Sequence, residues 1–358
     1  MSTTTTTDPG YDALLVVGFG GPEGPDDVLP FLENVLRGRP VPRERMLEVA
    51  EHYHHFGGVS PINGQVRDLI AALRPALDSA GVALPIYWGN RNWRPMLEDT
   101  LRSMAGAGVE HALAVVLSAY SSYSGCRQYR EDIQKAREAV GDLAPTVDKM
   151  RVFYNHPDWI AVNAARVLEA LGEVPGERRD AARLAFTAHS IPDSMAANCA
   201  YERQLRETCR LVADAAGVAP DRWALVYQSR SGRPTDPWLG PDILEHVDAL
   251  AGLGVADVLV QPVGFLSDHM EVMFDLDEEA RARAEALGLN LVRAGTAGTD
   301  PVFVAMLAGL IRERVAAEPD RRAVGEFPAS HDVCPANCCL PPARPGPSTP
   351  ATAREATR

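Results

Sequence analysis

Short apolar runs separated by longer amphipathic stretches make up most of the chain. Runs of about 4–8 apolar or β-branched residues are typical of strands, and apolar positions that recur three and four residues apart indicate helices. Because the runs lack a period of two, we expect strands that are covered on both faces. Eight runs are predicted to be strands: Ala13–Gly18, Ile86–Gly89, Ala112–Ser118, Met150–Tyr154, Leu184–Ala188, Ala224–Gln228, Val258–Val263 and Asn290–Ala294.

Helical patterns lie between most of these runs. A strand that is followed by a helix and another strand implies a crossover connection, and therefore a parallel sheet. The predicted helices are Val66–Ala80, Trp93–Ala107, Cys126–Val140, Trp159–Leu171, Tyr201–Ala216, Pro241–Leu253, Asp277–Leu287 and Val302–Val315.

The eight runs fall into two sets of four, and their ends echo one another. The first run of one set ends in Val-Gly-Phe-Gly-Gly-Pro22, and its counterpart ends in Thr-Ala-His-Ser-Ile-Pro192. The sequence therefore predicts two similar α/β halves, each a four-stranded parallel sheet flanked by helices, with a binding cleft between them. We expect the halves at 11–157 and 158–299, and a helix at 300–318 that packs back on the first half.

Composition excludes several classes of protein. The formal net charge is −13, which disfavours nucleic acid because a phosphate-binding protein needs a basic face. No run reaches the roughly 18 apolar residues of a spanning helix, so we expect no stable membrane anchoring. Residues 1–10 are rich in Thr and lack the features of a signal peptide, and residues 341–358 are rich in Pro and Thr, so both ends are predicted to be disordered. We expect a cytoplasmic protein, in which the cysteine thiols stay reduced.

One histidine stands at the end of a predicted strand. The run Leu184–Ala188 leads into His189, and Ile191-Pro192 then prevents further pairing. The carboxyl edge of an open α/β sheet is where ligands bind, so His189 is placed to act on one. A histidine that only caps or packs there is an equally weighted alternative.

A row of carboxylates follows the seventh predicted strand. Asp268, Glu271, Asp275 and Glu279 are three or four residues apart, which places them on one face of a helix. Carboxylates together with an imidazole suit Fe²⁺, and like charges this close repel one another unless a cation lies among them. The alternative is an ordinary solvated helix surface.

The first half offers groups of another kind. Four arginines between 37 and 45 could grip carboxylates through bidentate bonds, or they form a solubilising loop. The loop that contains Ser60 could bind an anion, and Phe19 could lie against a flat apolar ligand. Tyr129 is one of three tyrosines that we expect near the cleft, and three histidines at 52–55 are assigned to the surface.

Several of these segments together resemble a known family. They are Gly18-Phe-Gly-Gly-Pro22, Gly57-Gly-Val-Ser-Pro61, Thr187-Ala-His-Ser-Ile-Pro192, Asp236-Pro-Trp-Leu-Gly-Pro241 and the stretch from Pro262 to Asp277. In this order they closely resemble the signature segments of ferrochelatases, over about residues 12–316. The resemblance implies two Rossmann-like (chelatase-type) domains and a lyase that inserts Fe²⁺ into a porphyrin.

The resemblance also implies roles for particular residues. His189 and Glu271 would be the central pair that handles the pyrrole protons and the metal. Asp275, Asp277 and Glu279 would continue an acidic path away from Glu271. The residues that would contact the porphyrin are Phe19, Arg37, Ser60 and Tyr129.

The substrate is inferred from the region 43–58, which is polar and lacks the apolar lip of membrane-associated relatives. We therefore expect coproporphyrin III as the substrate, with protoporphyrin IX second, and transient contacts with neighbouring haem-pathway enzymes. Two other hypotheses are considered. One is a cobalt or nickel chelatase, and the other is a non-catalytic haem-binding or iron–sulfur sensor protein. The pair His189 and Glu271 disfavours a carrier, because a carrier needs no base.

Three cysteines cluster beyond the catalytic body, in an extension at 319–340. Cys334, Cys338 and Cys339, with the distant Cys126, could supply four thiolates to an iron–sulfur cluster or to zinc. Some ferrochelatases have a similar arrangement and carry a [2Fe–2S] cluster. Such a site would tie the extension to the first half.

Overall fold

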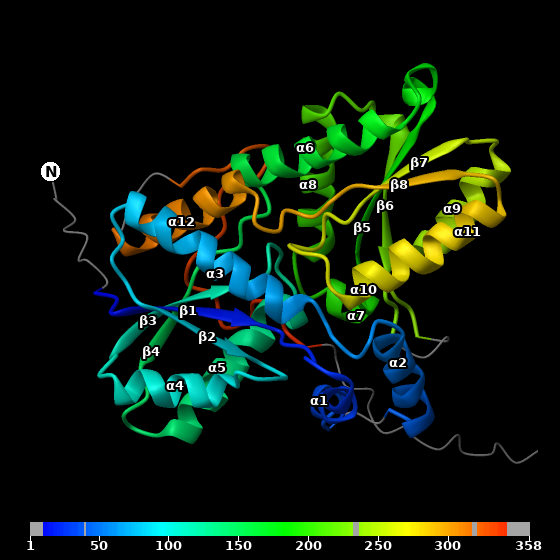
Figure 1. Cartoon of the computed structure of the whole chain (residues 1–358). Coiled ribbons are helices and arrows are strands. Elements are labelled where there is room, and N and C mark those ends of the chain that lie inside the picture. Colours follow the sequence, from blue (N-terminus) through cyan, green and yellow to red (C-terminus); the bar gives the residue numbers. More distant parts are fainter. Residues whose placement is uncertain (1–9, 39–40, 232–235, 317–320, 342–358) are drawn as a thin grey trace, which may run out of the picture.

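The computed structural model describes residues 10–38, 41–231, 236–316 and 321–341. It contains two four-stranded sheets whose strands all pair in parallel (Figure 1). The strand orders, β2-β1-β3-β4 and β6-β5-β7-β8, are the same when the halves are matched strand by strand, which confirms the predicted repeat. The strands are β1 Ala13–Gly18, β2 Ile86–Asn90, β3 His111–Val116, β4 Thr146–Lys149, β5 Arg183–His189, β6 Trp223–Gln228, β7 Asp257–Gln261 and β8 Asn290–Arg293.

Helices cover both faces of each sheet, as the continuous apolar strands require. The main ones are α1 Val28–Val35, α2 Arg43–His55, α3 Ile62–Ser79, α4 Leu97–Gly106, α5 Gln128–Val140, α6 Pro157–Glu173, α7 Asp193–Ala196, α8 Tyr201–Ala215, α9 Ile243–Gly252, α10 Met270–Val272, α11 Arg281–Ala286 and α12 Pro301–Val315. Two π-helical segments, η2 Tyr123–Arg127 and η5 Met273–Ala280, lead into α5 and α11. No helix in the described ranges is long and apolar enough to cross a membrane.

One large apolar core joins the two halves. It lies between the sheets and is built from α3, α6, α8 and α12, with Phe153, Trp159 and Phe303 in mutual ring contact at its centre. α4 and α5 cover the outer face of the first sheet, and α9, η5 and α11 cover that of the second. α12 runs beside α3 (Figure 1), so the last helix leaves the second half and returns to the first.

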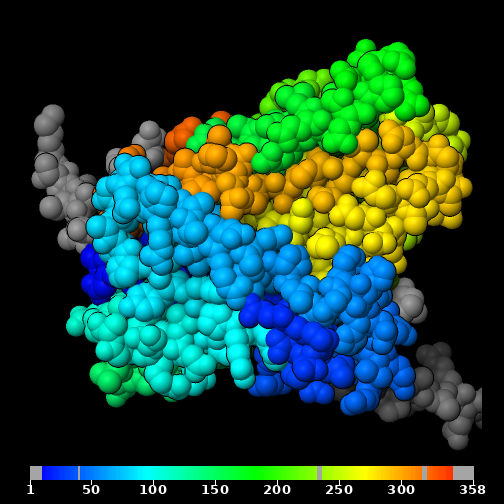
Figure 2. Space-filling model, in the orientation of Figure 1, coloured from blue at the N-terminus to red at the C-terminus, as the bar shows by residue number. Residues whose placement is uncertain are grey.

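Polar bonds also cross between the halves, which lie against one another along α3 in the space-filling view (Figure 2). The Gln65 side chain donates to the Asp268 carbonyl at 2.5 Å. The Tyr120 hydroxyl donates to the Val263 carbonyl at 2.9 Å. Both contacts bring loops at the carboxyl edge of one sheet against the other half.

The fourth strand lies elsewhere than predicted. The apolar run Met150–Tyr154 is buried but is not a strand, and the edge strand is the polar Thr146–Lys149 just before it. An edge strand is covered less than its neighbours, so it carries no apolar run, whereas Met150–Tyr154 enters the core between the sheets. The predicted arginine loop also differs, because Arg43 and Arg45 begin α2.

Two of the predicted boundaries fall at the limits of the described residues. Most of the predicted leader, 1–9, and nearly all of the tail, 342–358, lie outside the described residues. The predicted helix 300–318 corresponds to α12, Pro301–Val315, and the extension is described from Arg321 onward. The division of the chain at 157 stays a prediction.

Candidate active site

His189 is the last residue of β5, at the carboxyl edge of the second sheet. Its Nδ1 lies 2.5 Å from the Ser190 carbonyl oxygen, which only accepts hydrogen bonds, so Nδ1 carries the proton. The other ring nitrogen, Nε2, points to Glu271 and lies 3.6 Å from its Oε1. The Tyr201 hydroxyl donates to the His189 carbonyl and fixes the end of the strand.

Glu271 reaches this place from the neighbouring strand. β7 ends at Gln261, and the loop that follows packs closely on β5: a Cβ at Gly264 would lie 2.6 Å from that of Ala188. His269 then caps α10 by accepting a hydrogen bond from the Glu271 amide. A glycine at 264 is therefore required for Glu271 to approach His189.

The two side chains form an ion pair. Burial lowers the pKa of His189, but the charge of Glu271 and hydrogen bonds to Glu271 and the Ser190 carbonyl outweigh it and raise that pKa to about 9. Burial raises the pKa of Glu271, and His189 outweighs this effect and lowers it to about 2. In the absence of substrate, His189 is thus an imidazolium beside a carboxylate.

The carboxylates after Glu271 do not form one line. From Met273 the helix is π-helical, so the three-and-four spacing of an α-helix does not hold. Asp275 turns toward the end of β6, where Gln228 donates to its Oδ2 at 3.2 Å, and burial is the main cause that raises its pKa to about 7. Asp277 instead pairs with Arg293, at 2.6 Å.

Asp277 has a different partner from the other carboxylates of the predicted acidic path. Its carboxylate is held by a partly buried guanidinium, which also pairs with Asp268. Glu279 is exposed at the surface, and its remaining burial, followed by the charge of Asp242, raises its pKa. Among the described ion pairs, none joins an arginine to Glu271, Asp275 or Glu279.

α2 of the first half lies over this row, although its sequence predicted a loop and surface histidines. The His52 ring stacks on Phe274 with centroids 3.8 Å apart, and His55 lies 3.8 Å from Glu278. The Tyr53 hydroxyl is close enough to Glu271 for that charge to raise its pKa, after the larger effect of burial. The pair His189–Glu271 thus lies at the boundary between the halves.

The predicted porphyrin contacts have different surroundings. Phe19 follows β1, is 36% exposed, and packs edge-on against Phe31. Ser60 is buried, with its amide bonded to the Pro22 carbonyl. Tyr129 is buried in α5, and Arg37 is exposed just after α1.

Arg91 is a residue that the sequence analysis missed. It follows β2 at the carboxyl edge, and its guanidinium lies over the Tyr129 ring at 4.5 Å and near Phe19 at 5.8 Å. Asp132 accepts from it at 2.6 Å. The rule that singled out His189, a polar residue at a strand's carboxyl end, applies equally to Arg91 and would have found it.

The four cysteines of the predicted cluster lie together. Cys126, on η2, shares hydrogen bonds with Cys334 and Cys339, which lower the pKa of Cys126 and raise those of its partners. The sulfur atoms of Cys338 and Cys339 are 3.5 Å apart. His331, which the sequence analysis did not consider, has its donor atom within 4.8 Å of those of Cys334 and Cys338.

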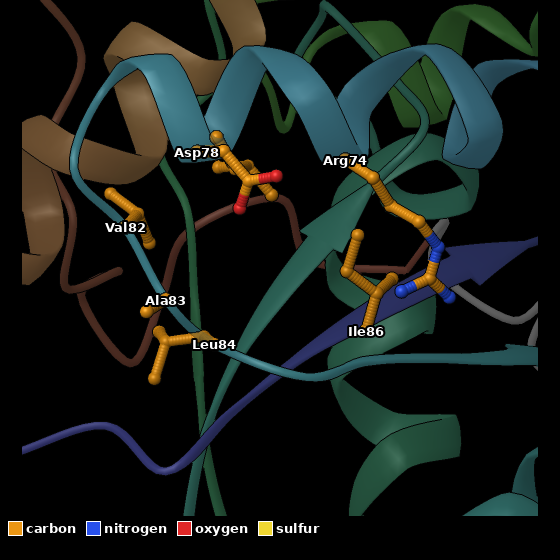
Figure 3. Close-up of a pocket in the computed structure, with 7 residues that line it drawn as sticks. Arg74, Asp78, Val82, Ala83, Leu84 and Ile86 are labelled. Atoms are coloured by element: carbon orange, nitrogen blue, oxygen red, sulfur yellow. The ribbon is translucent and has the colours of Figure 1, made fainter.

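Two surface hollows lie away from this chemistry. One, of about 280 Å³, is lined by residues of α3 and the chain before β2, including Arg74 and Asp78 (Figure 3). The other, of about 570 Å³, lies where Phe327 of the extension packs on α8. Neither contains a residue of the predicted site.

Known proteins identify the fold and the family. The family model described as "Ferrochelatase" matches residues 11–315. This chain belongs to the ferrochelatase family. The chain is 56% identical over 345 residues to "Ferrochelatase" from Rhodopirellula baltica, covering 94% of this chain and 96% of the relative.

Two further relatives carry a more specific name. "Coproporphyrin III ferrochelatase" from Streptomyces coelicolor is 50% identical over 355 residues, covering 93% of this chain and 94% of the relative. That from Nocardia farcinica is 51% identical over 348 residues, covering 93% and 98%. Among solved structures, "SirB from Bacillus subtilis with Fe3+" shares the fold, with a TM-score of 0.53, 14% identity, and coverage of 88% of this chain and 99% of that chain.

Proposed function

We propose that this ferrochelatase-family protein inserts Fe²⁺ into coproporphyrin III to give Fe-coproporphyrin III in haem biosynthesis. The substrate is supported by the two relatives of about half identity that bear its name. The observation that carries the reaction is the His189–Glu271 pair, with Nε2 3.6 Å from Oε1 at the boundary of the two halves.

His189 can act as a base only after its imidazolium loses a proton. A metal-free porphyrin holds two inner N–H protons that must leave, and the raised pKa keeps His189 protonated at neutral pH. Fe²⁺ that approaches Glu271 adds a positive charge, which lowers the pKa of the imidazole. Nε2 then releases its proton to solvent water and accepts one pyrrole proton, and the second pyrrole proton leaves by the same route to water, while the Ser190 carbonyl keeps Nδ1 protonated.

Asp275 and Glu279 supply carboxylates behind Glu271, which suit a divalent cation on its way to the pair. Their pKa values are both raised, mainly by burial, and a cation among them would favour the ionised forms. Asp277 is left out of this path, because it is paired with Arg293.

The first half is proposed to bind the porphyrin. Phe19 offers an exposed ring edge to a flat apolar ligand, and Arg37, Ser60 and Tyr129 are the proposed contacts for the propionates. Arg91, stacked on Tyr129, is buried close to both Tyr129 and Phe19 and would orient them.

The test of the substrate is a steady-state comparison of coproporphyrin III with protoporphyrin IX, followed by loss of the metal-free absorption. We expect a higher kcat/KM for coproporphyrin III. Its four propionates can form more polar contacts with the region 43–58 than the two propionates of protoporphyrin IX can. A clear preference for protoporphyrin IX would overturn the proposed substrate while leaving the family unchanged.

For the cysteines, we propose a [2Fe–2S] cluster held by Cys126, Cys334, Cys338 and Cys339. The fit rests on four free thiols in one place, of which Cys126 and Cys339 are almost fully buried. When bound, such a cluster supplies iron–thiolate bonds, and here these would fasten the extension to η2. The Arg127 guanidinium already holds the Ala336 and Cys338 carbonyls from the same turn.

Anaerobic purification followed by visible absorption and electron paramagnetic resonance tests the cluster. The iron–sulfur signals are expected in the wild-type protein and absent in Cys126→Ser. Zinc in place of iron and sulfide would instead favour a site that uses His331 with cysteines. We also propose a cytoplasmic location, since that compartment keeps thiols reduced and able to bind such a cluster.

A further inference from the structure

Ser229, the first residue after β6, has an unusual backbone conformation. Its φ is +60°, in the left-handed region, which it shares with Cys339 alone among the described non-glycine residues. A side chain in this region costs free energy relative to glycine, and such strain concentrates at functional sites. Glycine would therefore be less strained at this position, and the presence of serine indicates a role for its hydroxyl.

The Ser229 hydroxyl donates a hydrogen bond to Oδ2 of Asp275. The preceding side chain, Gln228, is completely buried, and its Nε2 donates to the same Oδ2 at 3.2 Å. The left-handed turn at Ser229 thus directs two consecutive side chains to one carboxylate oxygen. Two neutral donors on one oxygen fix its position and favour the ionised carboxylate.

Gln228 also reaches the residue that faces His189. Its Nε2 lies 3.2 Å from the Glu271 carbonyl oxygen, in the turn of α10 that leads to Asp275. One amide therefore fixes the backbone that carries Glu271 and the side chain that lies behind it. β6 pairs with β5 in a register that sets Gln228 beside His189. The strand that carries these donors is therefore hydrogen-bonded to the strand that carries the histidine.

We propose that Gln228 and Ser229 are positioning residues for the metal. They hold the Asp275 carboxylate behind Glu271, where it would contact the metal before Glu271 does. The proposal rests on the proposed function, in which Fe²⁺ passes these carboxylates to reach His189. Without the two donors, Asp275 would be a carboxyl group on a π-helical segment with no fixed direction toward Glu271. The metal would then be bound more weakly before transfer, whereas porphyrin binding, which is assigned to the first half, would not change.

Substitutions at Ser229 separate the hydroxyl from the strain. Ser229→Gly removes both, Ser229→Ala removes only the hydroxyl, and Ser229→Asn keeps a donor in a residue that tolerates this backbone. Gln228→Leu removes the second donor at similar volume. A hydrogen bond to a charged group is worth about 1.5–3 kcal/mol, so the KM for Fe²⁺ should rise about tenfold to a hundredfold in the glycine, alanine and leucine variants.

The measurement is made on the full-length protein with two readouts. Steady-state insertion gives separate KM values for Fe²⁺ and for porphyrin, and Mn²⁺ titration followed by electron paramagnetic resonance reports metal binding to carboxylates without porphyrin. We expect weaker Mn²⁺ binding and a higher Fe²⁺ KM in Ser229→Gly, with partial recovery in Ser229→Asn and an unchanged porphyrin KM. Ser79→Gly, at an exposed serine that bonds only its own helix, is the matched control and should change neither.

The melting temperature distinguishes this role from a structural one. Ser229→Gly should melt no lower than wild type, because it relieves strain, and yet bind metal weakly. Wild-type metal affinity in both Ser229→Gly and Gln228→Leu would overturn the proposal, as would a rise confined to the porphyrin KM. A wild-type protein that inserts no metal into any porphyrin would instead contradict the proposed function, so the two failures are distinguishable.

Discussion

The two halves of this protein have one scaffold and two chemistries. Their sheets have the same strand order, yet β1 ends in Phe19-Gly-Gly whereas β5 ends in His189-Ser-Ile. The carboxyl edge of the first half presents rings, Ser60 and a buried Arg91, and that of the second presents an imidazole and carboxylates. The scaffold decides where a ligand meets the chain, and the few residues after each strand decide what happens there.

The division of chemistry between the halves is tested most directly by substituting matched residues at the ends of β5 and β1. His189→Ala should lower kcat by about 10²- to 10⁴-fold, the usual contribution of a positioned acid–base group. Phe19→Ala should leave kcat within a few-fold and weaken porphyrin binding, because it deletes an exposed ring that packs on Phe31. Insertion rates and porphyrin fluorescence quenching check both. Equal losses of kcat would contradict the division of labour between the halves.

The second prediction tests what attaches α12 to the first half. Arg151, after β4, and Glu313, on α12, form a buried bidentate pair at 2.7 and 3.0 Å. Glu313→Gln leaves the Arg151 charge buried without a counter-charge, and the free energy of unfolding should fall by about 3–5 kcal/mol. Denaturant unfolding measures it.

The matched control for that pair is Arg102→Gln, which breaks exposed pairs with Glu98 and Asp99. Exposed pairs are worth about 0–1 kcal/mol, so this variant should unfold almost as the wild type does. If Glu313→Gln were as mild as the control, the return of α12 to the first half would depend on its apolar packing and on the Arg314–Asp148 pair instead.

The sequence reached the architecture because parallel sheets buried on both faces leave clear apolar runs. Seven of the eight predicted runs overlap observed strands, and His189 ends β5 as predicted. The missed strand, Thr146–Lys149, is an edge, where half-exposed polar residues remove the signal. α2 was missed because only Met46 and Ala50 of its residues are buried, which leaves little periodicity among its charges.

The candidate site was predictable in its central pair but not in its surroundings. His189 and Glu271 were located by strand ends and by family resemblance. The π-helical segment Met273–Ala280 was not predictable, because the spacing of the carboxylates was interpreted with an α-helical period. The pairing of Asp277 with Arg293 likewise has no signal in the local sequence. The contacts of Ser229 depend on a left-handed backbone that no local pattern indicates.

A third prediction compares the partly buried His189, beside a carboxylate, with the fully buried His156. In the metal-free protein, His189 has a pKa of about 9, whereas burial is the main cause that lowers the pKa of His156 to about 4. Glu271→Gln should lower the pKa of His189, because burial is then opposed only by the Ser190 carbonyl and the charge of Asp275. Imidazole NMR titration follows both, and His156 should not move.

The sign of the stability change follows from the same pKa values. The raised pKa of His189 stabilises the fold fully below 6.5, and this contribution is lost as the pH rises through 9. The lowered pKa of Glu271 stabilises it above 4.5, and this is lost as the pH falls through 2. Wild type should therefore exceed Glu271→Gln in stability most between pH 4.5 and 6.5. A difference that grew above pH 9 would contradict the ion pair.

The smallest expected effect concerns the polar bridge that holds the two edges in register. On α8, Gln204 accepts from the Ser121 amide at 2.7 Å and donates to the Ser121 hydroxyl at 3.1 Å. Three residues earlier on the same helix, Tyr201 holds the His189 carbonyl. α8 thus joins the loop after β3 in the first half to the end of β5 in the second.

Gln204→Leu leaves a buried amide of Ser121 without its acceptor, so the free energy of unfolding should fall by about 1–3 kcal/mol. A double-mutant cycle with Ser121→Ala should show a coupling energy of about 0.5–3 kcal/mol, since the residues are in contact. Thr208→Val is the control, because its hydroxyl bonds the backbone carbonyls of Tyr154 and Gln204 and not the loop after β3. Additive effects of Gln204→Leu and Ser121→Ala would mean that this bridge contributes nothing to the contact between the halves. A positive coupling would show that the edge of one sheet is fixed, through one helix, to the histidine of the other.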